Sequence, residues 1–218
     1  MNTFDKYWRE KVVRNTEKEV SKTVSCKLID NGNTDMVDYT QKLISTLRNE
    51  TIDEKIKNIF IKSACHLPHD KLISSKKVYE ETKSLSKTIK QLESDYKIDI
   101  KKYKNLSDEQ VDEIINLGWG LAGILKGDEI IATKIPSQFH EYFAETSPRK
   151  KKYFYCHCPR VKSVLLSTKK IDSIYCNCGG GFYVDVWEHI TGKDVKIEPL
   201  TTLFDGHDLC SFKISFID

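Results

Sequence analysis

Two Cys-x-Cys pairs constrain the fold of this chain more than any other feature. Cys156 and Cys158 form the first pair and Cys176 and Cys178 form the second, with seventeen residues between the pairs. Each pair follows an aromatic, β-prone run, so we expect each to lie where a strand ends. The second pair continues directly into three consecutive glycines and then a helical pattern. The sequence therefore predicts four thiols gathered where a sheet meets a helix.

Four thiols at one place form a common ligand set for a metal ion. Side chains two residues apart on a strand point to the same face, so neighbouring strands would bring all four sulfurs together. Such a set favours a closed zinc site, and an iron–sulfur cluster is an alternative. In an extended Cys-x-Cys the two Cβ atoms lie about 6.5 to 7 Å apart, so a bend is needed. Pro159 and Gly179, each directly after a pair, would allow that bend. Zinc at these four cysteines is our prediction, and reactive thiols or plain buried residues stay open as alternatives.

The second pair is also a candidate for catalysis. Cys178 lies at the predicted N-terminus of a helix, where the helix dipole lowers the pKa of a thiol. A thiolate at Cys176 or Cys178 would then act as a nucleophile. His157 separates the first two cysteines and should point to the opposite face of the strand, so we do not expect it to be a ligand.

Two further groups of residues are candidates for ligand binding. Cys65 and His69 are four residues apart at a predicted helix end, a spacing that suits one helix face. They would join the site if the fold brings them to the C-terminal cysteines. Trp187 and Glu188 follow the glycines on the predicted helix. We expect Trp187 to pack on the sheet, while Glu188 either faces a pocket or is exposed to solvent.

The region up to residue 105 is predicted to be helical. Apolar residues recur there at helical spacing, and Thr51-x-x-Glu54 has the pattern of a capping box. A lysine-rich connector over residues 97–105 is expected to end this region. The predicted helices cover residues 3–22, the segment from Met36 to Leu47, a segment that starts at Thr51, and residues 70–96.

Residues 106–218 are predicted to form an α+β region. Residues 195–198 and 209–214 alternate between apolar and polar side chains, which predicts two strands joined by a turn at Asp205-Gly206. A helix is expected over 179–191. Aromatic and β-branched runs predict further strands over residues 153–158, 161–167 and 171–178.

The predicted fold class is therefore α+β, with a helical N-terminal half packed on an antiparallel sheet formed by residues 153–217. We expect the helical region, 1–105, and the α+β region, 106–218, to form one compact unit.

Composition excludes several classes of function. Lys plus Arg total 35 and Asp plus Glu total 32, giving a net charge of +3, so we expect no nucleic-acid partner. No apolar run approaches the length of a membrane span, and the N-terminal residues lack an apolar signal core. We therefore expect a cytoplasmic protein, and thiols in that compartment stay reduced instead of forming a disulfide framework.

The C-terminal segment resembles a known ligand-binding domain. The glycine-rich start of a helix at Cys178-Gly179, the segment 192–198 (GKDVKIE) and the segment 206–214 (GHDLCSFKI) resemble the domain of 4-vinyl reductase proteins and of certain Golgi tethering subunits. This resemblance implies helices on an antiparallel sheet, a pocket between the layers and a homodimer. Many relatives carry a further cysteine where this chain has residues 199–201 (PLT), so a site that uses it would be missing. The Cys-x-Cys pairs resemble an uncharacterised bacterial group related to the L-2-amino-thiazoline-4-carboxylate hydrolases.

Three functions remain open from the sequence. The first is a small-molecule-binding or sensing domain with a cysteine-lined pocket that contains zinc. The second is a cysteine- or metal-dependent hydrolase of a small cyclic amidine or thioester-like substrate. The third is a structural or assembly protein in which the cysteines only brace the sheet. Whether the protein is an enzyme is left undecided.

Overall fold

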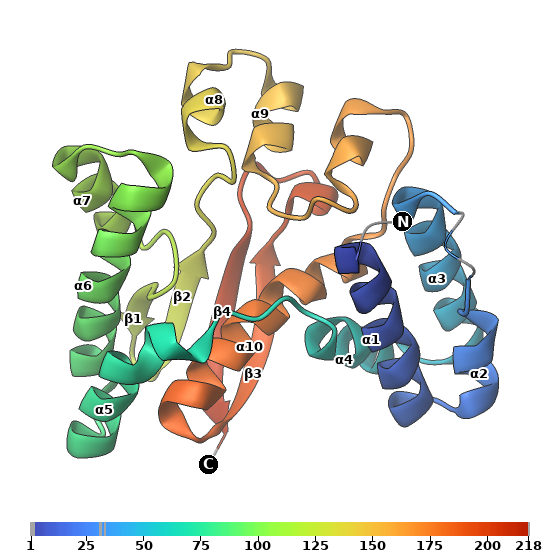
Figure 1. Cartoon of the computed structure of the whole chain (residues 1–218), viewed down its shortest axis with the longest axis horizontal. Coiled ribbons are helices and arrows are strands. Elements are labelled where there is room, and N and C mark those ends of the chain that lie inside the picture. The colour runs from blue at the N-terminus through green and yellow to red at the C-terminus, as the bar shows by residue number, and fades with distance from the viewer. Residues whose placement is uncertain (1–2, 31, 33, 218) are drawn as a thin grey trace.

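The computed structural model describes residues 3–30, 32 and 34–217. Helices make up most of the chain before residue 120, and a four-stranded antiparallel sheet lies mainly in its C-terminal part, which confirms the α+β prediction. The helices α1–α4 lie at one end of the molecule and α5–α7 at the other, with the sheet and α10 between them (Figure 1). The α-helices are α1 Thr3–Glu19, α2 Lys22–Lys27, α3 Met36–Glu50, α4 Asp53–Lys62, α5 Ile73–Thr82, α6 Leu85–Lys104, α7 Asp108–Asn116, α8 Phe139–Ala144, α9 Pro148–Tyr155 and α10 Asn177–Thr191.

The sheet has the strand order β1-β2-β4-β3. β3 and β4 pair antiparallel, with Ile197 opposite Ile214, and this confirms the predicted C-terminal strands and their pairing. The other two strands form a hairpin that the sequence analysis did not predict, and Ile130 of β2 lies opposite Ile214 on the other side of β4. The strands are β1 Ile124–Lys126, β2 Glu129–Thr133, β3 Asp194–Thr201 and β4 Ser211–Ile217.

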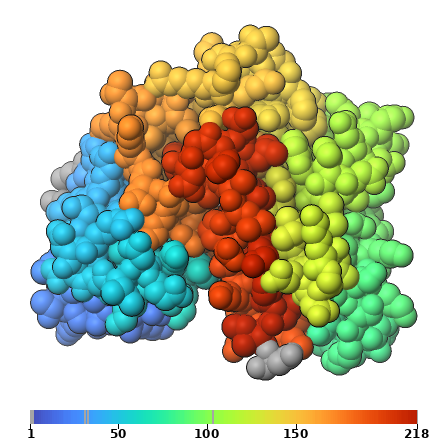
Figure 2. All heavy atoms as spheres, turned by 180° about the vertical axis from the view of Figure 1, so that it is seen from behind, coloured from blue at the N-terminus to red at the C-terminus, as the bar shows by residue number. Residues whose placement is uncertain are grey.

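One face of the sheet is covered by α10, as predicted for residues 179–191. Val186, Trp187 and Ile190 of this helix are buried in one cluster with Ile130 and Ile214 of the sheet. From behind, the β3–β4 hairpin reaches the surface between the N-terminal helices and the segment from α5 to β1 (Figure 2). Helix α10 therefore covers one face of the sheet, and on the opposite side β3 and β4 reach the molecular surface.

The three strands predicted over residues 153–178 are wrong. Residues up to Tyr155 belong to α9, which begins with Pro148 at its first turn, a position that suits the fixed φ of proline. The next two segments form 3-10 turns, Lys162–Leu166 and Ser173–Cys176. In the second turn the Asp172 side chain accepts a hydrogen bond from the backbone N–H of Ile174 at 3.0 Å. Helix starts and capping side chains thus outweigh the β propensity of these aromatic runs.

Several predicted helix boundaries also change. The helix predicted over 3–22 ends earlier, because Ser21 caps a separate α2. The capping box at Thr51 is wrong, since Thr51 ends α3 and α4 has no side-chain cap. The helix predicted over 70–96 is interrupted at Lys83, whose φ of 50° is left-handed.

Helix α6 then begins at the Ser84 cap and runs to Lys104, through the predicted connector over 97–105. Helix α7 has a complete capping box at Ser107.

The hydrophobic core crosses the predicted boundary at residue 105. Leu72, Tyr79 and Leu92 from the helical region are buried in the same cluster as Trp187 and Ile214. Close helix contact reinforces this connection at Gly181. A Cβ there would lie 2.1 Å from the carbonyl oxygen of Ile61 in α4.

Within the described residues, no helix combines the length and apolarity that crossing a bilayer would require.

Candidate functional site

A cavity of about 740 Å³ lies between α6, the start of α10 and the segment that follows α9. Six of the seven cysteines line it, while Cys26 is exposed in α2. All seven are free thiols. The cavity cysteines are Cys65, Cys156, Cys158, Cys176, Cys178 and Cys210.

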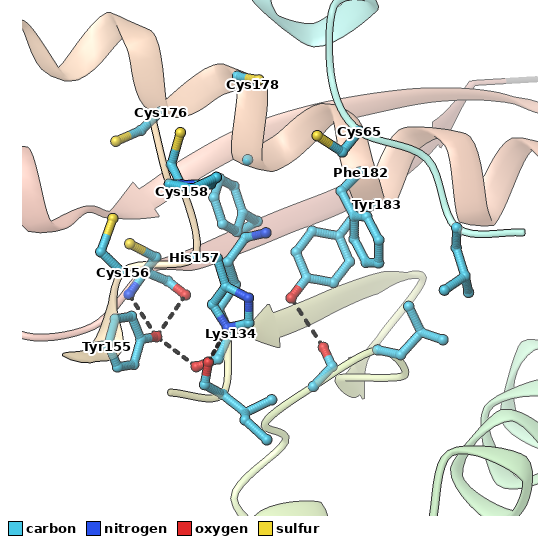
Figure 3. Close-up of a pocket in the computed structure, with 18 of the residues that line it drawn as sticks. Cys65, Lys134, Tyr155, Cys156, His157, Cys158, Cys176, Cys178, Phe182 and Tyr183 are labelled. Carbon is cyan, nitrogen blue, oxygen red and sulfur yellow. Dashed lines mark hydrogen bonds between the residues drawn. The ribbon is translucent and has the colours of Figure 1, made fainter. Parts of the chain in front are cut away.

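The two predicted cysteine pairs reach the cavity from the ends of two helices. Cys156 and Cys158 follow the C-terminus of α9, and Cys176 and Cys178 flank the start of α10. Figure 3 shows them in the same region of the cavity wall, with Cys65 on a separate segment. The four predicted cysteines thus share one cavity, although helix ends and turns place them there in place of strand ends.

Burial keeps four of the cavity thiols protonated. Desolvation raises the pKa of Cys156 and of Cys178 to about 12, and it also raises the pKa of Cys176 and of Cys210. The lowered pKa that we predicted for Cys178 from the helix dipole is therefore wrong, because desolvation outweighs the dipole. Neutral thiols are weak nucleophiles, since the thiolate is the reactive form.

The thiols do not form a preassembled metal site. In the part of the chain that the structure describes, no three or more His, Cys, Asp or Glu side chains have an arrangement that would hold a metal ion. The Cys158 sulfur is instead 2.9 Å from the Tyr175 hydroxyl, within hydrogen-bonding distance. Zinc at the four predicted cysteines would require their side chains to move, and it stays a prediction.

A lysine that the sequence analysis did not single out lies inside the cavity. Lys134 follows β2 directly, and its backbone N–H donates to the Cys210 carbonyl at 2.9 Å. Its ammonium lies over the rings of Phe182, Tyr183 and Phe212, at 5.1, 5.5 and 5.9 Å from their centroids. Burial lowers the pKa of Lys134. The β2 strand that positions Lys134 has the alternation typical of a half-buried strand, which is the signal that could have located it.

His157 and Arg160 also line the cavity. We expected His157 to point away, but its Nε2 is hydrogen-bonded to the carbonyl of Ile135. Desolvation and the Lys134 charge lower the pKa of His157 to about 4. The Arg160 guanidinium lies 3.4 Å from an Asp5 carboxylate oxygen. Arg160 therefore has an anionic partner within the protein, and His157 carries no charge at neutral pH.

The other predicted ligand-binding residues lie elsewhere. Among the described residues, His69, Trp187 and Glu188 do not line the cavity. The His69 Nε2 is 3.1 Å from an Asp185 carboxylate oxygen, and its ring stacks on His189 with centroids 3.9 Å apart.

Trp187 is fully buried against the sheet, as expected from its place on the helix. Its ring packs edge-on against Phe216, with centroids 5.9 Å apart. The Glu188 carboxylate accepts a hydrogen bond from the backbone N–H of Val195 at 3.2 Å. Trp187 therefore stabilises the packing of α10 on β4, and Glu188 stabilises the junction of α10 and β3. Of the four predicted ligand-binding residues, Cys65 alone reaches the cavity.

Comparisons with known proteins add no relative. No family model matches the sequence, no curated protein matches it, and no solved structure matches the fold. The resemblance to the 4-vinyl reductase-type domain therefore stays a prediction, and the cavity itself is the feature that points to a function.

Proposed function

We propose that this protein binds a small molecule with an apolar body in the cysteine-lined cavity, as a binding or sensing domain. The observation that carries the proposal is the cavity of about 740 Å³, a volume within the range of roughly 300–1,000 Å³ that is typical of ligand sites. Its walls are mainly apolar and aromatic. Wall residues of this kind include Leu92, Tyr96, Leu121, Phe182, Tyr183 and Phe212.

Binding is better supported than hydrolysis. A cysteine hydrolase needs a thiolate, and desolvation raises the pKa of the cavity thiols Cys156 and Cys178 to about 12. A purely structural role would be expected to fill the space between the cysteines with side chains. A cavity of this size argues against such a role.

Three further expectations belong to this proposal. Zinc held by the cysteine pairs would make the site a metal-containing one. The cytoplasm is the compartment that we propose, because free thiols persist under reducing conditions. A homodimer is implied by the family resemblance alone.

The proposal is tested with a neutral apolar dye, N-phenyl-1-naphthylamine, whose fluorescence increases in apolar surroundings. Cys65 is exposed at the edge of the cavity, so Cys65→Trp should obstruct the opening without disturbing the core. We expect this variant to weaken dye binding by about tenfold, equal to ~1.4 kcal/mol.

The matched control is Cys26→Trp, at the exposed cysteine that lies outside the cavity. It should bind the dye as the unmodified protein does. Absence of dye binding to the unmodified protein, or equal binding by both variants, would contradict the proposed function.

A further inference from the structure

We propose that Lys134 is the anion-binding residue of this cavity, and that the natural ligand combines an apolar body with one carboxylate or similar anionic group. The inference rests on the proposed function and deepens it, since it names the chemical class of the ligand. It is carried by the surroundings of the Lys134 ammonium and by the different surroundings of the other cations at the cavity.

Lys134 is held rigidly at its backbone and directed inwards. The Tyr155 hydroxyl donates a hydrogen bond to its carbonyl at 2.6 Å, and the Lys134 N–H donates to Cys210 at 2.9 Å. Figure 3 shows the side chain between Tyr155 on one side and Tyr183 on the other. A Cβ added at Gly179 would lie 3.3 Å from the Lys134 Cε, so the start of α10 closes over the side chain.

The other basic side chains that line the cavity have partners in the protein. Lys71 forms an ion pair with Asp99 at 2.9 Å, and Arg160 lies 3.4 Å from Asp5. The Lys104 ammonium donates a hydrogen bond to a backbone carbonyl. Among the residues that the structure describes, no carboxylate forms an ion pair with Lys134, whose ammonium contacts aromatic rings.

An ammonium in these surroundings favours the binding of an anion. Aromatic faces attract a cation but do not neutralise it, and a desolvated charge without a counter-ion is unfavourable. An anionic group that enters the cavity would supply the counter-charge where the surrounding dielectric is low and the attraction is strong. The aromatic and aliphatic walls would take up the apolar body of the same molecule. A small hydrated anion has no apolar surface to bury against these walls, so an amphipathic organic anion fits the cavity better.

The test uses two dyes that share one skeleton. 8-Anilino-1-naphthalenesulfonate is N-phenyl-1-naphthylamine with an added sulfonate, so the pair isolates the anionic group. Lys134→Met should weaken binding of the sulfonate by about tenfold and change binding of the neutral dye by less than about twofold. Lys134→Arg keeps the charge and should retain most of the sulfonate affinity. The matched control, Lys126→Met, removes an exposed lysine of β1 and should affect neither dye.

A second measurement needs no variant and so does not depend on how the variants fold. On the unmodified protein, 2-naphthoate should displace the neutral dye at a lower concentration than 2-naphthalenemethanol, although the alcohol is the more apolar molecule. If the alcohol competes as well as the acid, or if Lys134→Met folds and binds both dyes unchanged, the assignment of Lys134 is wrong while the cavity stays a binding site. If the neutral dye does not bind at all, the proposed function and this inference fail together.

Discussion

The Tyr155 hydroxyl donates a hydrogen bond to the Lys134 carbonyl at 2.6 Å, and it accepts one from the backbone N–H of Cys210 at 3.0 Å. A single buried hydroxyl therefore joins the end of α9 to the segments that leave β2 and enter β4. We predict that Tyr155→Phe lowers the free energy of unfolding by about 1–3 kcal/mol, because a buried N–H and a buried carbonyl lose their partner. Urea denaturation measures this change.

The control for this substitution is Tyr153→Phe on the same helix. Tyr153 is half-buried, and its ring lies 4.3 Å from the Lys162 ammonium. This variant removes a hydroxyl for which no hydrogen bond is found among the described residues, so the change in unfolding free energy should be small. Equal losses in the two variants would show that Tyr155 contributes through its ring alone.

Two glycines of α10, Gly179 and Gly181, should differ in how strongly substitution by alanine destabilises the protein. A Cβ at Gly181 would lie 2.1 Å from the Ile61 carbonyl oxygen, which belongs to the backbone and cannot move without shifting α4. We expect Gly181→Ala to destabilise the protein by about 3 kcal/mol or more.

At Gly179 the nearest atom would be the Lys134 Cε at 3.3 Å, on a flexible side chain. Alanine also favours a helix over glycine by roughly 0.5–1 kcal/mol, so Gly179→Ala should stay within about 1 kcal/mol of the unmodified protein. Thermal and urea unfolding of the two variants test the pair. A mild effect at Gly181 would mean that α4 and α10 are not in close contact.

The two buried cavity thiols Cys156 and Cys178 should differ strongly in reactivity from the exposed thiols. At pH 8 a pKa of about 12 leaves about one thiolate in ten thousand at Cys156 and Cys178. We expect iodoacetamide to modify these two residues about a hundredfold or more slowly than the exposed Cys26 and Cys65. Peptide mass spectrometry of quenched time points measures each rate.

Protein unfolded in urea provides the control for this experiment, because all seven cysteines should then react at similar rates. Rapid modification of Cys178 in the folded protein would contradict the raised pKa and would revive the hydrolase hypothesis.

The zinc hypothesis for the cysteine pairs predicts the metal content of the purified protein. Protein purified without added metal should contain about one zinc ion per chain if four thiols hold it. Cys176→Ser should then release the ion and lower the melting temperature, whereas Cys26→Ser, outside the cavity, should retain it. Elemental analysis with an ultraviolet–visible spectrum measures the metal and separates zinc from an iron–sulfur cluster. A metal-free chain with unaltered stability in a chelator would exclude both.

The elements predicted correctly have strong local signals. β3 and β4 alternate over several residues around the turn at Gly206, and α10 follows a helical period up to Gly192. The β1–β2 hairpin has only three to five residues per strand, and pairing with the distant β4 holds it in place. Tyr155 and its neighbours were predicted as a strand because local β propensity ignores the start of a helix at Pro148.

The site residues also divide into those with a local sequence signal and those whose place depends on distant contacts. Cysteines are scarce and paired, so Cys156 and Cys176 were found from the sequence alone. Lys134 is one of many lysines, and its place in the cavity depends on the pairing of β2 with β4. The alternation of β2 could have predicted the strand that precedes Lys134, but no local pattern shows that this strand pairs with β4. The same holds for Arg160, whose partner Asp5 lies near the N-terminus.

The cavity wall draws residues from nearly the whole length of the chain, from Phe4 in α1 to Phe212 in β4. Occupancy of the cavity would therefore be linked to the folding of the entire molecule, and a ligand at one hundred times its dissociation constant would add about 2.7 kcal/mol to global stability. A fragment that begins at residue 106 would keep Lys134 and five of the six cavity thiols yet lose the walls from α1 and α6. For this chain, ligand affinity is a measure of complete assembly.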